Sequence, residues 1–204
     1  MTRATLVVGS NATLAAVLAS RDPFDLRAGD DVVVVPTAAA FSGAAEAAVL
    51  LAHELADLEV AVEALMVTDR AGAFDAALAA RVSDADLVLL CDGSALHARS
   101  VWRGTPVGAA ITVAARVGAV GAVASLLGEV MVDPRGGAPT TGLARWTGVV
   151  VAAPAGPVQS ARTAALVGDA DTLVVVGATG AMLIDTQGWR ALGGDVTATG
   201  VVAP

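Results

Sequence analysis

The sequence is poor in the residue types on which several classes of function depend. It contains one cysteine, Cys91, no lysine and no tyrosine, and only 3% of its 204 residues are aromatic. A single cysteine excludes an internal disulfide and a Cys-rich metal site. The only histidines, His53 and His97, are too far apart for a spacing such as His-x-x-x-His. We therefore expect no metal site and no cofactor.

Positive charge and long apolar runs are also scarce. Twelve arginines face twenty acidic residues, giving a net charge of −8. Binding to nucleic acid or to an anionic membrane surface needs clustered cations, so we expect neither. The N-terminal apolar run is too short for a secretory signal, and the most apolar window, 106–132, contains Arg116 and Glu129. These features predict a soluble, cytoplasmic protein.

Small aliphatic residues are abundant. Hydrophobic residues make up 55% of the chain, which predicts a core built from Ala, Val and Leu. A chain of this length can bury such a core in one domain. Because no internal repeat or linker is found, we expect a single domain over 1–204.

Short apolar runs alternate with Ala-rich amphipathic segments, a pattern typical of βαβ units around a parallel sheet. The strands we expect are Leu6–Gly9, Val32–Val35, Val60–Val67, Leu87–Leu90, a strand beginning near Gly118, Val149–Ala152 and Thr172–Val176. The helices we expect are Ser10–Ser20, Ser42–Asp57, Ala71–Val82, Ala95–Arg116 with a break at 104–106, and Val158–Val167. Met182–Asp185, Gln187-Gly188 and Gly194–Gly200 predict a closing antiparallel hairpin.

Four segments, in order, carry a resemblance to a known family. They are Val32–Ala38 (VVVVPTA), Cys91–Ser94 (CDGS), Gly121–Ser125 (GAVAS) and Asp133–Gly137 (DPRGG). The chain resembles the peptidase S51 family, which includes peptidase E and cyanophycinase. The resemblance implies the class I glutamine-amidotransferase-like fold, a three-layer, doubly wound and mostly parallel sheet of the flavodoxin-like kind.

The catalytic positions depart from the family pattern. Gly121–Ser125 stands where the family has Gly-x-Ser-Ala-Gly, so the nucleophile position falls on Val123. Valine has no oxygen to attack a substrate, and its β-branch disfavours a strained elbow, so we expect the turn to relax. The family histidine falls in Val151–Ala155, and a family acidic segment falls on Gly177–Thr179, which has no acid. The resemblance therefore implies a catalytically degenerate member.

Alternative catalytic groups remain open. Ser125 or Ser94 could act with His97, which follows the loop after the fourth strand. The more ordinary interpretation makes Ser125 a helix N-cap and His97 a residue of a helix surface. Cys91 is more simply a small buried residue at a strand end than a nucleophile, and His53 is a solvated helix residue. Gly9-Ser10-Asn11 is a weak phosphate-site pattern and more simply a turn with a cap.

Three functions follow as hypotheses. The first is an inactive homologue that binds a small peptide-like ligand or a protein partner, with ligand-binding candidates Asp92, Gly93, Ser94, Val123, Ala124 and Asp133. Asp92 breaks the family's Gly-Gly loop and is expected to block or refit its oxyanion-hole backbone. The second is a serine hydrolase with the relocated site just described. The third is a structural subunit, a homodimer or a heteromer with a paralogue, for which Trp102, Trp146 and Trp189 are candidate anchors.

Overall fold

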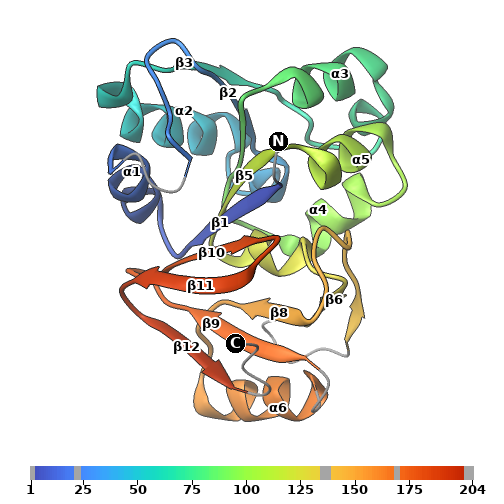
Figure 1. Ribbon diagram of the computed structural model, residues 1–204. Helices are drawn as coiled ribbons and strands as arrows, with labels where there is room; N and C mark the ends of the chain where they lie inside the picture. The colour runs from blue at the N-terminus through green and yellow to red at the C-terminus, as the bar shows by residue number, and fades with distance from the viewer. Residues whose placement is uncertain (1–2, 21–23, 134–138, 168–170, 200–204) are drawn as a thin grey trace.

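The main element of the structure is a seven-stranded sheet of mostly parallel strands. The computed structural model describes residues 3–20, 24–133, 139–167 and 171–199. The strand order is β11-β10-β1-β5-β4-β2-β3 (Figure 1). These strands are β1 (Ala4–Val8), β2 (Asp31–Val35), β3 (Ala61–Ala64), β4 (Leu87–Leu90), β5 (Arg116–Val120), β10 (Ala181–Asp185) and β11 (Gly188–Gly193). From β1 to β3 all neighbours are parallel, whereas β10 pairs antiparallel with both β1 and β11.

Helices cover both faces of this sheet, as the continuous apolar runs of the central strands require. One face packs against α1 (Asn11–Ala19) and α2 (Ala44–Glu54). The other packs against α3 (Ala76–Asp84), α4 (Ala95–Trp102) and α5 (Pro106–Val113). Figure 1 shows the two groups of helices on opposite sides of the strands. The α/β fold with two helical layers and a C-terminal antiparallel hairpin, β10–β11, confirms the predicted fold class.

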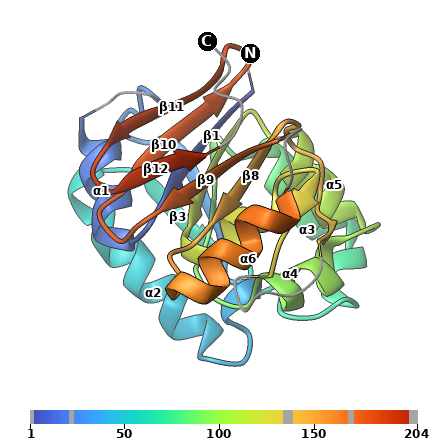
Figure 2. The same cartoon turned by 90° about the horizontal axis from the view of Figure 1, so that it is seen from below.

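A second, three-stranded sheet lies beside the first. It has the order β12-β9-β8 and consists of β8 (Val149–Ala152), β9 (Thr172–Val176) and β12 (Val196–Thr199). One face packs against α6 (Pro157–Val167) and the other joins the core of the main sheet through Val151 and Val174. Figure 2 looks onto α6, with this sheet behind it. A short pair, β6 (Val130–Met131) and β7 (Thr140–Thr141), completes the strands of the described ranges.

Several predicted boundaries are wrong, each for a local reason. Ser42 does not cap α2; its hydroxyl donates to Ala39 O, and the helix starts after Gly43 at a φ of 106°. The predicted helix from Ala71 is a 3-10 turn, η3 (Gly72–Phe74), followed by α3, because the Asp75 carboxylate caps the amides of Ala77 and Leu78.

Strand boundaries near the ends of the sheets also differ from the prediction. The strand predicted over Val60–Val67 is shorter because β3 is the exposed edge of its sheet. β5 begins at Arg116, which the prediction assigned to a helix. The predicted closing segment Gly194–Gly200 does not join the hairpin, since β12 pairs with β9. Gly200 lies outside the described residues.

Candidate functional site at the carboxyl ends of β4 and β5

Two of the segments that carry the family resemblance meet at the carboxyl ends of the parallel strands. β2 is followed by Pro36 and the 3-10 turn η1 (Thr37–Ala39), and β4 by the loop Cys91–Ser94. Ser94 N donates to Ala38 O at 2.8 Å. A side chain on Gly93 would collide with the same carbonyl, since its Cβ would lie 2.2 Å from that oxygen. The close approach explains why the loop keeps glycine at this position.

The sharp turn after β5 is made by Gly121. Its φ is 63°, a left-handed conformation that glycine adopts without strain. The 3-10 helix η4 (Gly121–Leu126) starts there. A strand that ends in a positive-φ residue and continues into a helix is the geometry of a nucleophile elbow. The crest of this turn is therefore Gly121, two residues before the position predicted from the sequence.

The carboxylate of Asp92 fills the space above Gly121. A Cβ on Gly121 would lie 2.3 Å from Asp92 Cγ. Asp92 Oδ1 accepts two backbone hydrogen bonds, from Gly93 N at 2.7 Å and from Ala122 N at 2.8 Å. Two amides converging on one oxygen at about 2.7–3.1 Å is the arrangement of an oxyanion hole. In this chain the oxygen between the two amides is Asp92 Oδ1, an atom of the protein itself. This arrangement is consistent with the expectation that Asp92 blocks or refits the oxyanion-hole backbone.

Val123 and Ala124 do not line an accessible site. Both side chains are fully buried in the core between α4, η4 and the second sheet. The residue with the positive φ at the crest of the turn is Gly121 and not Val123, and neither Val123 nor Ala124 exposes its side chain to a ligand. The turn takes its positive φ at Gly121, so the β-branched Val123 can occupy an ordinary core position.

The side chains proposed for a relocated hydrolase site, those of Ser94, Ser125 and His97, do not hydrogen-bond to one another. Ser125 is buried and its hydroxyl donates to Ala122 O at 2.8 Å, so it lies inside η4 and is not the predicted helix N-cap. Ser94 does cap α4, accepting from the backbone N of His97 at 3.2 Å. The His97 ring is 2.9 Å from Thr68 O through Nε2 and lies edge-on against Phe41 at 4.5 Å. Within the described ranges no serine hydroxyl bonds to a histidine ring.

The remaining candidate residues are a buried thiol, an exposed histidine, a helix cap and an aspartate that already has an interaction partner. Cys91 is buried at the end of β4, and burial raises the pKa of its thiol to about 12, with the Asp92 charge adding to the shift. His53 is exposed on the last turn of α2. Ser10 caps α1 by accepting from Thr13 N, as predicted. Asp133 follows β6, is partly buried and already has an interaction partner.

The positions expected to hold a base or an acid are apolar or occupied by backbone. Val151 and Ala152 are the buried end of β8. The loop Gly177–Thr179 packs its backbone against the turn after β1, with Thr13 Oγ1 donating to Ala178 O at 3.0 Å. Among the residues the structure describes, no three His, Cys, Asp or Glu side chains are grouped to hold a metal ion. No helix of these ranges is long and apolar enough to cross a membrane.

One polar cluster, at the opposite end of the sheet, is not predicted by the sequence. Arg145 is buried beside Arg3 and lines a pocket with Trp146. Nothing in the local sequence separates Arg145 from the other eleven arginines, because its burial is created by β1 and α5, which lie far away in the chain.

Comparison with known proteins supports the fold. No model of a protein family and no curated protein sequence matches the chain. A crystal structure of a peptidase from an acI-B1 Actinobacterium is similar, with a TM-score of 0.73 at 16% sequence identity, covering 98% of this chain and 95% of that one. A candidate peptidase E from Listeria monocytogenes EGD-e is similar with a TM-score of 0.64 at 11% identity, covering 99% and 100%. At such identities the likeness shows a shared α/β fold.

Proposed function

We propose that this protein is a catalytically inactive relative of serine peptidases that acts by binding, either a small peptide-like ligand or a protein partner. The observation that carries the proposal is the turn after β5. A serine hydrolase places its attacking oxygen on that turn. Here the turn residue is Gly121, which has no side chain, and the Asp92 carboxylate lies within 2.6 Å of where one would begin.

The electrostatics of the same site also oppose hydrolysis. An oxyanion hole stabilises charge that develops on the substrate, and this works only when its donors are free to receive that charge. Gly93 N and Ala122 N already donate to a carboxylate. A second anionic oxygen brought to these amides would meet the charge of Asp92, so the transition state for attack on an amide would be repelled.

A serine-reactive probe tests the proposal. We expect a fluorophosphonate to leave the native protein unlabelled, and a panel of Asp-X dipeptides and other amides to remain uncleaved. The matched control is the double variant Gly121→Ser with Asp92→Gly, which restores a hydroxyl at the crest and removes the group that collides with it. We expect this variant also to lack turnover, because neither histidine is hydrogen-bonded to the turn: the His97 ring is bonded to Thr68 O, and His53 is on the last turn of α2.

Two results would overturn the proposal. One is stoichiometric labelling of Ser94 or Ser125 in the native chain. The other is amide cleavage that His97→Ala abolishes, which would establish the relocated hydrolase. Val123→Ser is a poor control, because it would bury a hydroxyl in the core instead of presenting it to a substrate.

A second candidate, a structural subunit that pairs with itself or with a paralogue, is favoured by apolar side chains exposed around α4. Phe41 is 84% exposed and contacts His97 of α4, and Leu96, the residue before His97 in that helix, is also exposed. Phe74 is also exposed and lies under Arg70, which donates to Ser100 O on α4. The tryptophans are poor anchors by comparison, since Trp102 is fully buried and donates to Thr37 Oγ1.

A further inference from the structure

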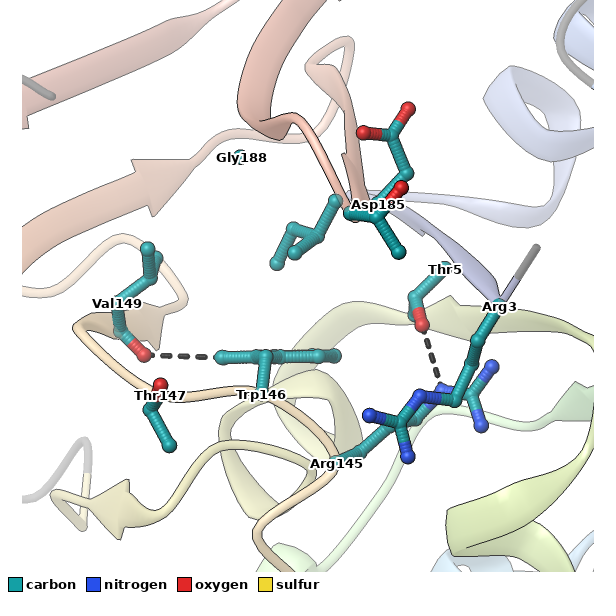
Figure 3. A pocket seen from close by; sticks show the side chains of 10 residues that line it. Arg3, Thr5, Arg145, Trp146, Thr147, Val149, Asp185 and Gly188 are labelled. Atoms are coloured by element: carbon teal, nitrogen blue, oxygen red, sulfur yellow. Dashed lines mark hydrogen bonds between the residues drawn. The ribbon is translucent and has the colours of Figure 1, made fainter. Parts of the chain in front are cut away.

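A pocket of about 280 Å³ lies where β1 begins, between the main sheet and the loop that leads into β8 (Figure 3). Gly121 and Asp92 lie at the other end of the parallel strands, so the pocket is separate from the candidate site above. Its volume is slightly below the roughly 300–1,000 Å³ of pockets that hold drug-sized ligands, which suits a smaller molecule.

One wall of the pocket contains an unusual cation. Arg145 is the only charged side chain among the buried residues of the described ranges. Its Nε donates to Thr5 Oγ1 at 2.6 Å, Nη1 to Ile111 O and Thr112 O, and Nη2 to Ala4 O. Every acceptor is neutral, and of the five N–H groups of a guanidinium four are used. Burial lowers the pKa of Arg145 to about 10, with a smaller contribution from the charge of Arg3.

Arg3 places a second positive charge beside the first. Its Nη1 donates to Thr112 O at 3.4 Å, and Arg145 Nη1 donates to the same oxygen at 2.9 Å. Neither guanidinium has a carboxylate partner in the described part of the chain. Two adjacent cations, one of them buried, repel each other and lack a counter-charge, so an anion bound here would be stabilised by both.

The one acidic residue that lines the pocket is already neutralised. Asp185 accepts from Gln187 N at 2.7 Å and forms an ion pair with Arg190 at 3.0 Å. In Figure 3 its carboxylate points away from the two guanidinium groups. The residues that line the pocket include two arginines and one aspartate, which is paired with Arg190, so the lining is positive in a chain whose net charge is −8.

The opposite wall is apolar and firmly held. It is formed by Trp146, Val149 and Ile184. Trp146 Nε1 donates to Val149 O at 3.0 Å, which fixes the indole ring and satisfies its only donor. A rigid aromatic wall facing a pair of cations selects ligands with an apolar body and one anionic end.

We propose that this pocket binds a small organic carboxylate, with its anionic end on Arg3 beside Arg145 and its apolar body against Trp146 and Ile184. The pocket shares no residue with the Gly121 turn, so carboxylate binding here does not depend on the proposed loss of catalysis.

Benzoate is a suitable probe, and the arginine and tryptophan N–H signals in ¹⁵N-correlated NMR spectra are the readout. We expect benzoate to shift the Arg145 Nε–H and Trp146 Nε1–H signals saturably, at one site per chain. Arg3→Gln should weaken binding by at least about tenfold, or about 1.4 kcal/mol. Arg162→Gln, which removes an exposed arginine of α6 remote from the pocket, should bind like the native protein. Arg3 is the residue of choice because it is exposed, whereas loss of Arg145 would break four hydrogen bonds of the fold.

Neutral benzamide and inorganic phosphate, at constant ionic strength, complete the test. Benzamide should bind at least about tenfold more weakly than benzoate if the charge is recognised. Failure of benzoate to saturate either signal, or equal binding by Arg3→Gln, would overturn the proposal. Phosphate binding as tight as benzoate would overturn the assignment to an organic carboxylate, because the apolar wall would then contribute nothing.

Discussion

At the residue scale, Gly121 and Asp92 depend on each other. The carboxylate of Asp92 lies where a side chain on residue 121 would begin, and its Oδ1 satisfies the amide of Ala122 on the same turn. A larger residue at position 121 therefore requires a smaller one at position 92. Replacing Asp92 by a smaller residue leaves the amides of Gly93 and Ala122 without this acceptor. The lack of a side chain at position 121 and the hydrogen bonds that Asp92 accepts there are two consequences of one local arrangement.

Removal of the Asp92 carboxylate should destabilise the turn. Hydrogen bonds to a charged group contribute about 1.5–3 kcal/mol each, and exposure to water reduces this, so we expect Asp92→Ala to lose about 1–2 kcal/mol of unfolding free energy. Asp92→Asn should lose less, since its amide oxygen can still accept from both backbone groups. Urea unfolding measures both, with Asp57→Ala as the control at an exposed aspartate of η2 (Ala56–Leu58). Equal stabilities of Asp92→Ala and the native chain would contradict the assigned bonds.

Cys91 should make stability fall at alkaline pH. Its thiol has an ordinary pKa of 9.0, which burial raises to about 12 in the folded chain. Between these values the unfolded chain releases a proton that the folded chain retains, so the free energy of unfolding decreases as pH rises. The decrease approaches about 1.4 kcal/mol per pH unit.

The comparison with Cys91→Ala isolates this contribution, because all other titrating groups are shared. We expect the difference in unfolding free energy between the native protein and Cys91→Ala to shrink from pH 8 to pH 10 by about 1 kcal/mol. Chemical denaturation at a series of pH values provides the measurement. Parallel pH profiles for the two proteins would show that the thiol titrates equally in both states.

At the scale of elements, the turn between β1 and α1 is fitted to the loop between β9 and β10. Gly9 N donates to Gly180 O at 3.1 Å, and a Cβ on Gly9 would lie 1.8 Å from Gly177 O. This contact connects the start of the main sheet to the chain that returns from the second sheet. The phosphate-site pattern at Gly9-Ser10-Asn11 is thus explained by packing and by the cap of α1.

Gly9→Ala and Gly118→Ala form a matched pair that tests this contact. Both add one methyl group to a closely packed glycine. At Gly118 the nearest atom is the movable side-chain tip of Leu89, whereas at Gly9 it is backbone that cannot yield locally. We expect Gly9→Ala to cost about 1–3 kcal/mol more than Gly118→Ala in urea or thermal unfolding. Equal losses would show that the β9–β10 loop moves freely.

At the scale of the whole molecule, the exposed apolar side chains around α4 predict self-association or pairing with a paralogue. We expect light scattering after size exclusion to give a mass above 20.0 kDa that depends on concentration. Phe41→Ser with Phe74→Ser should shift the mass towards the monomer. Val158→Ser, at an exposed position on α6, is the control. A native monomer at all concentrations, alone and mixed with a paralogue, would exclude the subunit hypothesis.

Element types and their order could be predicted because each depends on neighbouring residues. The uninterrupted run Val32–Val35 is buried in β2 on both faces, and Ser10 and Thr105 cap helices through hydrogen bonds three residues along the chain. Composition and periodicity are sufficient for such features. The absence of a serine hydroxyl on the turn after β5 also follows from the sequence, since neither Gly121 nor Val123 carries one.

Tertiary structure alone decided which residue occupies the crest of that turn, because the family pattern placed the crest at Val123, whereas β5 ends at Val120 and the chain turns at Gly121. It also decided that β12 leaves the hairpin for the second sheet, a pairing between segments about twenty residues apart. The burial of Arg145 is of the same kind. Its acceptors come from β1 and α5, so no local property of the sequence could reveal that this one arginine lies in the interior beside a second cation.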